Sequence, residues 1–296
     1  MNKKSIIFII ITAICFGTME VASKLAGLSF HAIQLVFIRF FIGGIFLLPF
    51  AIKELKKRKI KLTPGDLGYL LGLGVICVCI SMAMFQYGVK RINANLASII
   101  ISMNPLFTMV FAHFLLHESF TKRKALVLLV SFAGLLIILQ PGSLMSGKLD
   151  TAGLMITLGA AVTFALYTAL GKLRLERLGG MVQNSFSFLI GSAVLLIYML
   201  PAGIPVVKGI TVASLPLLLY LGIVVTGIGY YAFLKAIELA GPSNASIAFF
   251  IKPMVAPVAS LVVLGENITL NFVIGVLFIL AGSYINMKAP AKKAAI

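Results

Sequence analysis

The chain has 296 residues, of which 60% are hydrophobic, and its 25 Lys and Arg against eight Asp and Glu give a net charge of +17. Soluble globular domains are about 45–50% apolar, so this composition leaves too little polar sequence for a soluble catalytic domain. The basic residues lie in short segments between apolar runs, which indicates membrane orientation and argues against nucleic-acid binding.

Ten apolar runs follow one another along the chain, each close to the roughly 20 residues that a helix needs to cross the hydrocarbon layer. A span in lipid must satisfy its own backbone hydrogen bonds, so each run is predicted to be a helix. The first run follows Lys3 and Lys4 without a clear cleavage site, and we interpret it as a retained span. The runs cover residues 5–26, 31–52, 68–89, 94–116, 124–141, 151–172, 182–200, 214–236, 243–264 and 269–288.

The Lys and Arg residues predict the orientation. With the N-terminus inside, 18 of the 25 fall in cytoplasmic segments, the richest being residues 53–61, and five fall outside. Short cytoplasmic loops carry the excess of Lys and Arg in membrane proteins. The sequence therefore predicts a multi-pass protein of the cell inner (cytoplasmic) membrane with both termini in the cytoplasm.

The chain also repeats itself at half its length. Shifting it by 148 residues aligns the halves without a gap, and the matches include Pro105 with Pro253, Glu118 with Glu266, and Ala97-Ser98-Ile99 with Ala245-Ser246-Ile247. Residues 1–148 and 149–296 are thus predicted to be two repeats. Each holds five spans, an odd number, so the second repeat must enter the membrane inverted. The predicted fold class is an all-α membrane protein of ten transmembrane helices, in the architecture of alternating-access transporters.

Several segments resemble one transporter family. They are Phe16-Gly17 and Lys24 in the first span, Arg39-Phe40 in the second, and the motifs NPLFTMVFAHFLLHE (Asn104 to Glu118) and KPMVAPVASLVVLGE (Lys252 to Glu266). Over nearly its whole length the chain resembles the EamA-type branch of the drug/metabolite transporter superfamily. The resemblance implies ten helices around a central cavity and secondary transport of small metabolites, commonly the export of amino acids or related compounds. The family often has Trp-Gly in the first span, whereas this chain has no Trp.

Glu20 is the most informative charged residue, because it lies in the first span at roughly 9 Å from the outer end. Charges at such depth are costly and usually face the bundle interior or water. Arg39 lies at nearly equal depth in the second span, and Lys24 lies one turn from Glu20. Two interpretations stay open: an ion pair of Glu20 with Arg39 or Lys24 that only fixes packing, or contact of Glu20 with substrate or a coupling proton.

Lys252 lies near the middle of the ninth span, directly before Pro253, and Asn104-Pro105 occupies the matching place in the fourth span. Proline kinks a helix by freeing a backbone carbonyl. Interrupted helices at corresponding places in two repeats point to the substrate site, although the prolines could serve shape alone. We therefore predict that Lys252 lines the cavity and binds a negative group of the substrate, with Asn104 as its counterpart.

Further substrate-binding candidates are polar groups within the sixth, seventh and eighth spans, namely Tyr167, Asn184 and Tyr230. Each could instead satisfy its hydrogen bonds inside the bundle. Glu118 and Glu266, at the ends of the fourth and ninth spans, are expected to bond loop backbone or the N-terminus of the next helix. The three cysteines are interpreted as buried apolar fillers.

The sequence contains neither a nucleophile–base set nor a phosphate-binding Gly-rich motif, so neither an enzyme nor an ATP-driven pump is predicted. His113 and His117 have metal-compatible spacing but no third ligand, and no metal or cofactor is expected. The predicted function is secondary export of amino acids or similar small metabolites by alternating access. Lys252 and Arg39 would face the carboxylate of the substrate and Glu20 its amine.

Two other functions stay open. In a proton-coupled exporter of organic cations or drugs, Glu20 would exchange a proton for the cargo, although Lys252 would repel a cation. A non-transporting membrane scaffold would need no internal repeat. The partners expected from the sequence are a small-molecule substrate, the lipid bilayer and possible coupling protons, without nucleic acid.

Overall fold

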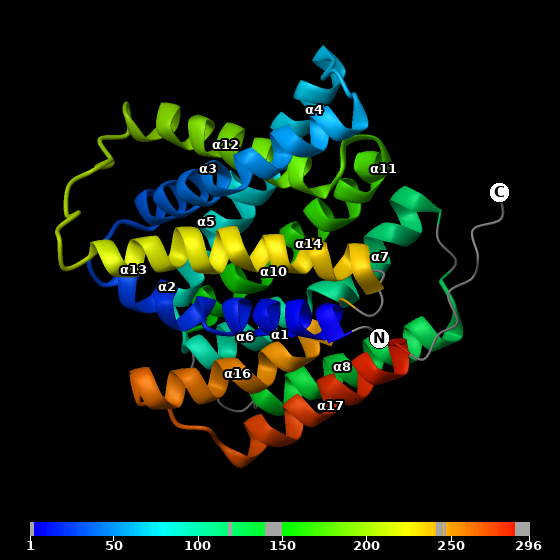
Figure 1. Ribbon diagram of the computed structural model, residues 1–296. Coiled ribbons are helices and arrows are strands. Elements are labelled where there is room, and N and C mark those ends of the chain that lie inside the picture. Colours follow the sequence, from blue (N-terminus) through cyan, green and yellow to red (C-terminus); the bar gives the residue numbers. More distant parts are fainter. Residues whose placement is uncertain (1–2, 118–119, 140–149, 241–244, 246, 288–296) are drawn as a thin grey trace.

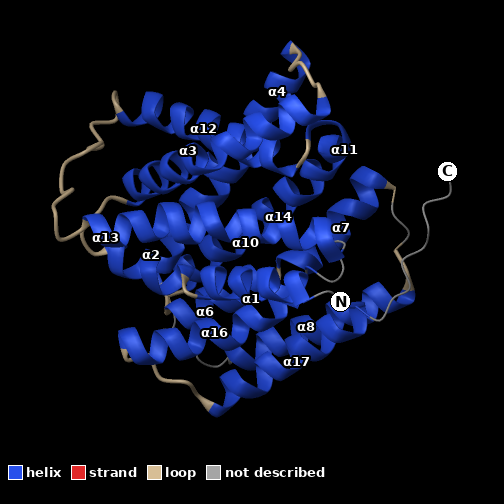
Figure 2. Cartoon of the chain, in the orientation of Figure 1, coloured by secondary structure: helices blue, strands red, loops and turns tan. Residues whose placement is uncertain are grey.

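The computed structural model describes residues 3–117, 120–139, 150–240, 245 and 247–287, and all of its elements are helical (Figures 1 and 2). Glu118 and the boundary between the two predicted repeats lie outside these residues. The helices are α1 (Lys3–Gly17), α2 (Met19–Gly27), α3 (Ala32–Arg58), α4 (Pro64–Gly74), η1 (Val75–Met82), α5 (Ala83–Arg91), α6 (Ala94–Ser102), α7 (Asn104–Leu116), α8 (Lys122–Leu139), α10 (Thr151–Gly171), η2 (Lys172–Arg174), α11 (Leu175–Leu178), α12 (Gly180–Met199), α13 (Leu215–Leu219), η3 (Tyr220–Ile228), α14 (Gly229–Ala240), α16 (Ile247–Leu264) and α17 (Leu270–Met287).

Seven stretches of the described chain are helical, long and apolar enough to cross a membrane. They are Lys3–Gly27, Ala32–Arg58, Pro64–Arg91, Ala94–Leu116, Thr151–Leu178, Gly180–Met199 and Leu215–Leu239. Two shorter apolar helices, Ile251–Leu264 and Leu270–Gly282, follow. The helical, membrane-type composition agrees with the sequence analysis, whereas the count of ten spans and the inverted arrangement stay predictions.

The long stretches are not uniform helices. The first is broken at Thr18, whose hydroxyl donates to the carbonyl of Ile14 at 2.9 Å, and the fourth is broken at Met103. Pro105 lies in the first turn of α7, where its missing N–H costs nothing, whereas Pro253 lies inside α16. Two stretches contain a π-helical segment, η1 and η3, in their middle.

Both described ends of the chain lie at the same end of the bundle (Figure 1). The start of α1, the end of α17, α11 and the connection from α3 to α4 are found there, while the connection from α12 to α13 lies at the opposite end. We call these the terminal end and the opposite end. Between them, aromatic rings fill the centre: Tyr230 packs edge-on against Phe16 and Phe188 at centroid distances of 5.2 and 5.0 Å.

Candidate functional site

A buried ion pair joins α2 to α16. Lys252 Nζ donates to Glu20 Oε1 at 2.7 Å, although the two residues are 232 positions apart in the chain. Both side chains are buried, with exposed fractions of 2% and 0%. Burying a charge is costly unless it is paired, so each of these residues depends on the other. The sequence suggested Arg39 or Lys24 as the partner if Glu20 forms an ion pair, and the structure shows Lys252 in that place.

The close approach of α1 and α16 allows this pair to form. A Cβ atom at Gly17 would lie 2.6 Å from Val255 Cβ and 3.6 Å from the Lys252 carbonyl oxygen. Only a residue without a side chain fits at such a crossing. The break at Thr18 follows directly, and Glu20 lies in the first turn of α2. Gly17 thus brings α16 close to the point where Glu20 enters the bundle.

Arg39 lies nearby but is held by other groups. Its Nε donates to Thr226 Oγ1 at 2.9 Å, and its Nη2 lies 3.0 Å from Met19 Sδ. The Thr226 hydroxyl in turn donates to the carbonyl of Leu221 within η3. Arg39 is 3% exposed and lies within electrostatic range of Glu20. The positive charge of Arg39 therefore acts on the ion pair without contacting it.

Cys77 of η1 lies in the same interior region of the bundle as Arg39. Cys77 is fully buried and lies within electrostatic range of Arg39, Tyr167 and Tyr230. The Tyr167 hydroxyl donates to Asn184 Oδ1 at 2.8 Å, which joins α10 to α12. Cys15 and Cys77 are buried, as the sequence suggested, whereas Cys79 is half-buried. Arg39, Tyr167 and Tyr230 are therefore each within electrostatic range of the same thiol.

Among the residues that the structure describes, four buried polar atoms on α2, α6 and α7 have no hydrogen-bond partner. They are Glu20 Oε2, Ser23 Oγ, Ser98 Oγ and Asn104 Nδ2. Asn104 Oδ1, by contrast, accepts from Thr108. Helices α2, α6 and α16, which carry Glu20 and Ser23, Ser98, and Lys252, pack against one another. A buried polar group without a partner costs about 1–3 kcal/mol, so a ligand that bonded to any of these atoms would recover part of that cost.

Glu266, between α16 and α17, bonds to backbone N–H groups and to one lysine. Its carboxylate accepts from the N–H groups of Ala94 and Asn95 at 2.7 and 3.0 Å, and Lys24 Nζ donates to it at 3.1 Å. The carboxylate therefore binds a helix N-terminus, as predicted, but the helix is α6 and not the next helix in the chain. Sequence reasoning paired Lys24 with Glu20 and missed this contact.

Known proteins resemble this chain over most of its length. The model of the EamA-like transporter family matches residues 3–140 and again residues 151–288. A protein of Clostridium kluyveri described as an uncharacterized transporter is 40% identical over 295 residues, which cover 98% of this chain and 95% of that protein. The S-adenosylmethionine uptake transporter of Rickettsia prowazekii is 29% identical over 153 residues, or 52% of this chain and 49% of that protein. A solved crystal structure matches with a TM-score of 0.69 over 97% of both chains at 16% identity, which shows a shared fold alone.

Proposed function

Since this chain belongs to the EamA-like transporter family and is a multi-pass membrane protein, we propose that it carries a small zwitterionic metabolite of the amino-acid class by alternating access, in the direction of export. The observation that carries the proposal is the buried Glu20–Lys252 ion pair. An ammonium and a carboxylate held side by side are what a zwitterion can replace, group for group. The proposed substrate-binding residues are Glu20, Arg39, Asn104, Tyr167, Asn184, Tyr230 and Lys252.

The atoms without hydrogen-bond partners suggest how a zwitterion would be oriented in this site. Glu20 Oε2 is a spare acceptor for the substrate's ammonium, and the hydroxyl of Ser23 lies one turn further on the same helix. Asn104 Nδ2 is a spare donor, which suits a carboxylate drawn to Lys252. When the substrate enters, its two charges replace the partners that Glu20 and Lys252 give up. Neither protein charge is then left buried and unpaired, so release of the ion pair costs little.

The alternative of an organic-cation exporter is less well supported. Around the site two buried cations, Arg39 and Lys252, face one buried anion, Glu20. A cationic substrate bound to Glu20 would leave Lys252 without a partner and close to a like charge. A zwitterion avoids this repulsion. The Rickettsia relative does not separate the two alternatives, because S-adenosylmethionine carries a sulfonium as well as an ammonium and a carboxylate, and the match covers about half of each chain.

We also propose the architecture that the sequence predicted: ten spans, in which residues 1–148 and 149–296 form inverted repeats around a central site, in the inner membrane. The family model matches once on each side of residue 148. The terminal end, which has the basic segment 53–61 and Arg174 and Arg177 near it, would face the cytoplasm (Figure 1).

Transport into proteoliposomes tests the function. We expect the purified protein to exchange one or more amino acids across the membrane and not to transport simple organic cations. The matched control is the double variant Glu20→Met/Lys252→Met, which removes both charges together and should fold but not transport. Exchange of organic cations without amino acids, or unchanged rate and apparent affinity in the double variant, would overturn the proposal.

A further inference from the structure

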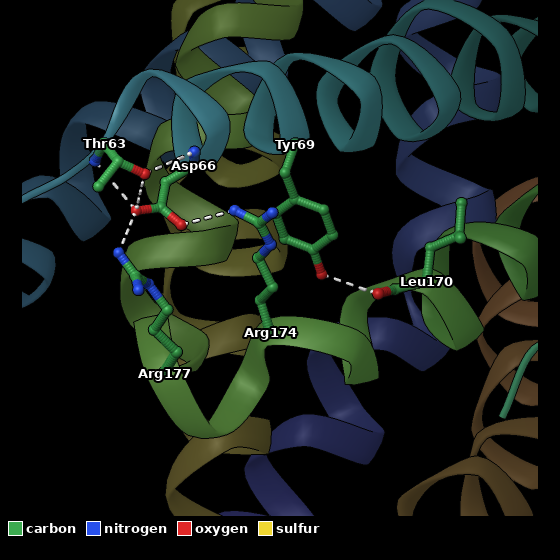
Figure 3. A network of polar contacts seen from close by, with 6 residues as sticks. All are labelled: Thr63, Asp66, Tyr69, Leu170, Arg174 and Arg177. Carbon is green, nitrogen blue, oxygen red and sulfur yellow. Dashed lines mark hydrogen bonds and ion pairs between the residues drawn. The ribbon is translucent and has the colours of Figure 1, made fainter.

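The two ends of the bundle are each closed by a carboxylate that ties the first half of the chain to the second. At the terminal end, Asp66 of α4 accepts from Arg174 Nη1 and Arg177 Nη2, each at 2.7 Å (Figure 3). At the opposite end, Glu266 accepts from Lys24 and from the N-terminus of α6. The three charged side chains between the ends, Glu20, Arg39 and Lys252, are at most 3% exposed.

The Asp66 cluster is built for a strong and specific contact. Thr63 and Asp66 form a capping box at the start of α4, with the Thr63 N–H and hydroxyl donating to Asp66 Oδ2 at 3.0 and 2.8 Å. Asp66 has no exposed side-chain surface, whereas Arg174 and Arg177 are 39% and 52% exposed. The carboxylate is therefore rigidly placed, while the two guanidinium groups can leave it for water.

Neighbouring polar contacts reinforce the Asp66 cluster, so that several interactions and not one ion pair hold these helices together. Figure 3 shows Tyr69 beside Arg174, with the guanidinium carbon 5.2 Å from the ring centroid, and the Tyr69 hydroxyl donating to the carbonyl of Leu170 at 2.7 Å. On α3, Arg58 Nη1 donates to the carbonyl of Glu176 at 2.9 Å. The segment from Leu170 to Arg177 is thus held against α3 and α4 by several polar contacts at once.

At the opposite end, the closure lies next to the proposed substrate site. Helices α2 and α16 are bridged twice: Glu20 to Lys252 in the interior, and Lys24 to Glu266 directly after α16 ends. Because Lys24 lies one turn from Glu20 on α2, a displacement of α2 at the site also moves Lys24. Substrate that separates Glu20 from Lys252 therefore leaves Lys24–Glu266 as the remaining charged link between these two helices.

From this geometry we propose that Asp66 with Arg174 and Arg177 forms the gate at the terminal end, and Glu266 with Lys24 the gate at the opposite end. Alternating access requires that one gate opens while the other stays closed. The inference rests on the proposed transport function, and it adds five residues that act on access to the site without contacting substrate.

The buried thiol of Cys77 reports access to the site from either side. In a Cys15→Ala/Cys79→Ala background it is the remaining cysteine, and it lies within electrostatic range of Arg39. Its modification by a small, charged, membrane-impermeant methanethiosulfonate is measured in vesicles of both orientations. The test compares Asp66→Asn and the double variant Arg174→Gln/Arg177→Gln with Glu266→Gln and Lys24→Gln. The Arg and Lys variants change partly exposed side chains and leave both carboxylates and the α6 N-terminus intact.

We expect opposite effects. The Asp66 and Arg variants should raise the modification rate from the terminal end by at least about fivefold, the low end of typical coupling between sites, and not from the other side. The Glu266 and Lys24 variants should do the reverse. The control is Arg91→Gln, which breaks an exposed ion pair with Asp150 at 2.8 Å and should change neither rate.

The outcomes separate this inference from the proposed function. Equal changes in the Cys77 modification rate from both sides would refute the proposed gates, even if amino acids are transported. So would an unchanged rate in the Arg174→Gln/Arg177→Gln and Lys24→Gln variants. The expected one-sided changes in a protein that transports no amino acid would support the gates and reject the proposed substrate class. The conservative variant Asp66→Glu should keep most of the closure, because the charge is retained.

Discussion

Removing one member of the buried ion pair should be far more harmful to stability than removing both. In Lys252→Met, the Glu20 carboxylate stays fully buried and loses its 2.7 Å partner, while its other oxygen already has none. Breaking a buried pair in this way costs about 3–5 kcal/mol. At roughly 2 °C per kcal/mol for a chain of this length, the melting temperature should fall by about 6–10 °C.

The double variant Glu20→Met/Lys252→Met leaves no buried charge in the pair, and replacement of such pairs by apolar side chains of similar volume is often neutral or stabilising. Thermal unfolding in detergent of the wild type, Glu20→Met, Lys252→Met and the double variant completes a double-mutant cycle. We expect the double variant to melt close to the wild type. Additive losses in the double variant would refute the reasoning, as would a Lys252→Met protein that melts at the wild-type temperature. In either case Glu20 and Lys252 would not depend on one another.

Two other predictions follow from the fold. Gly17→Ala places a Cβ 2.6 Å from Val255 Cβ and should cost about 1–3 kcal/mol by overpacking, with reduced transport, whereas Gly72→Ala, which has nothing within 4 Å, should leave melting and transport unchanged or slightly raise the melting temperature. Reporter fusions at the N-terminus and at the C-terminus should both report the cytoplasm, and an external signal from either would overturn the orientation drawn from the Lys and Arg residues.

The helical runs were readable from the sequence because lipid permits few alternatives. A backbone without water must bond to itself, so long apolar runs could be placed to within a few residues, as α10 at Thr151–Gly171 illustrates against the predicted 151–172. The interruptions were less visible. Thr18 and Met103 break their helices without a proline at the break itself, and η1 and η3 have no composition that distinguishes them from ordinary apolar helix.

The energetic cost of a charge in an apolar run singled out the candidate site residues, but it did not identify their partners. A charged residue deep in an apolar run is conspicuous, which singled out Glu20, Arg39 and Lys252. Depth counted from a short loop compares only helices that are neighbours in the chain, and it suggested Arg39 as the partner of Glu20. The actual partner lies 232 residues away, and its approach depends on the absence of a side chain at Gly17.

The gate at the terminal end had a local signal that was not used. Thr63 followed by Asp66 is a capping-box spacing, which predicts the start of a helix and a carboxylate fixed there. Arg174 and Arg177 were read only as determinants of orientation. That the same charges meet across the two halves depends on how α4 packs against the α10–α12 connection, and a single sequence does not contain this information.

The matched positions of the two halves divide into those that shape the backbone and those that carry charge. Gly43 and Gly74 recur at the 148-residue offset as Gly191 and Gly222. Each contact pairs one glycine from each half: a Cβ at Gly74 would lie 2.9 Å from the Gly191 nitrogen, and one at Gly43 would lie 3.2 Å from the Gly222 oxygen. Both contacts lie at or within a π-helical region, so the crossing that permits close packing is made twice, with the halves exchanged.

The charged residues break this equivalence. At the same offset, Glu20 aligns with Thr168, Lys252 with Asn104, and Asp66 with Ser214. If the repeats exchange shapes during transport, as inverted repeats do, two identical halves would favour neither orientation of the substrate and neither side of the membrane. In the proposed mechanism the unequal charges remove that degeneracy, because the ion pair fixes which way a zwitterion lies and Ser214, the position that matches Asp66, carries no charge. If the two halves are inverted repeats, as we propose, their matched glycine contacts would support the motion, and the differences in charge would give it a direction.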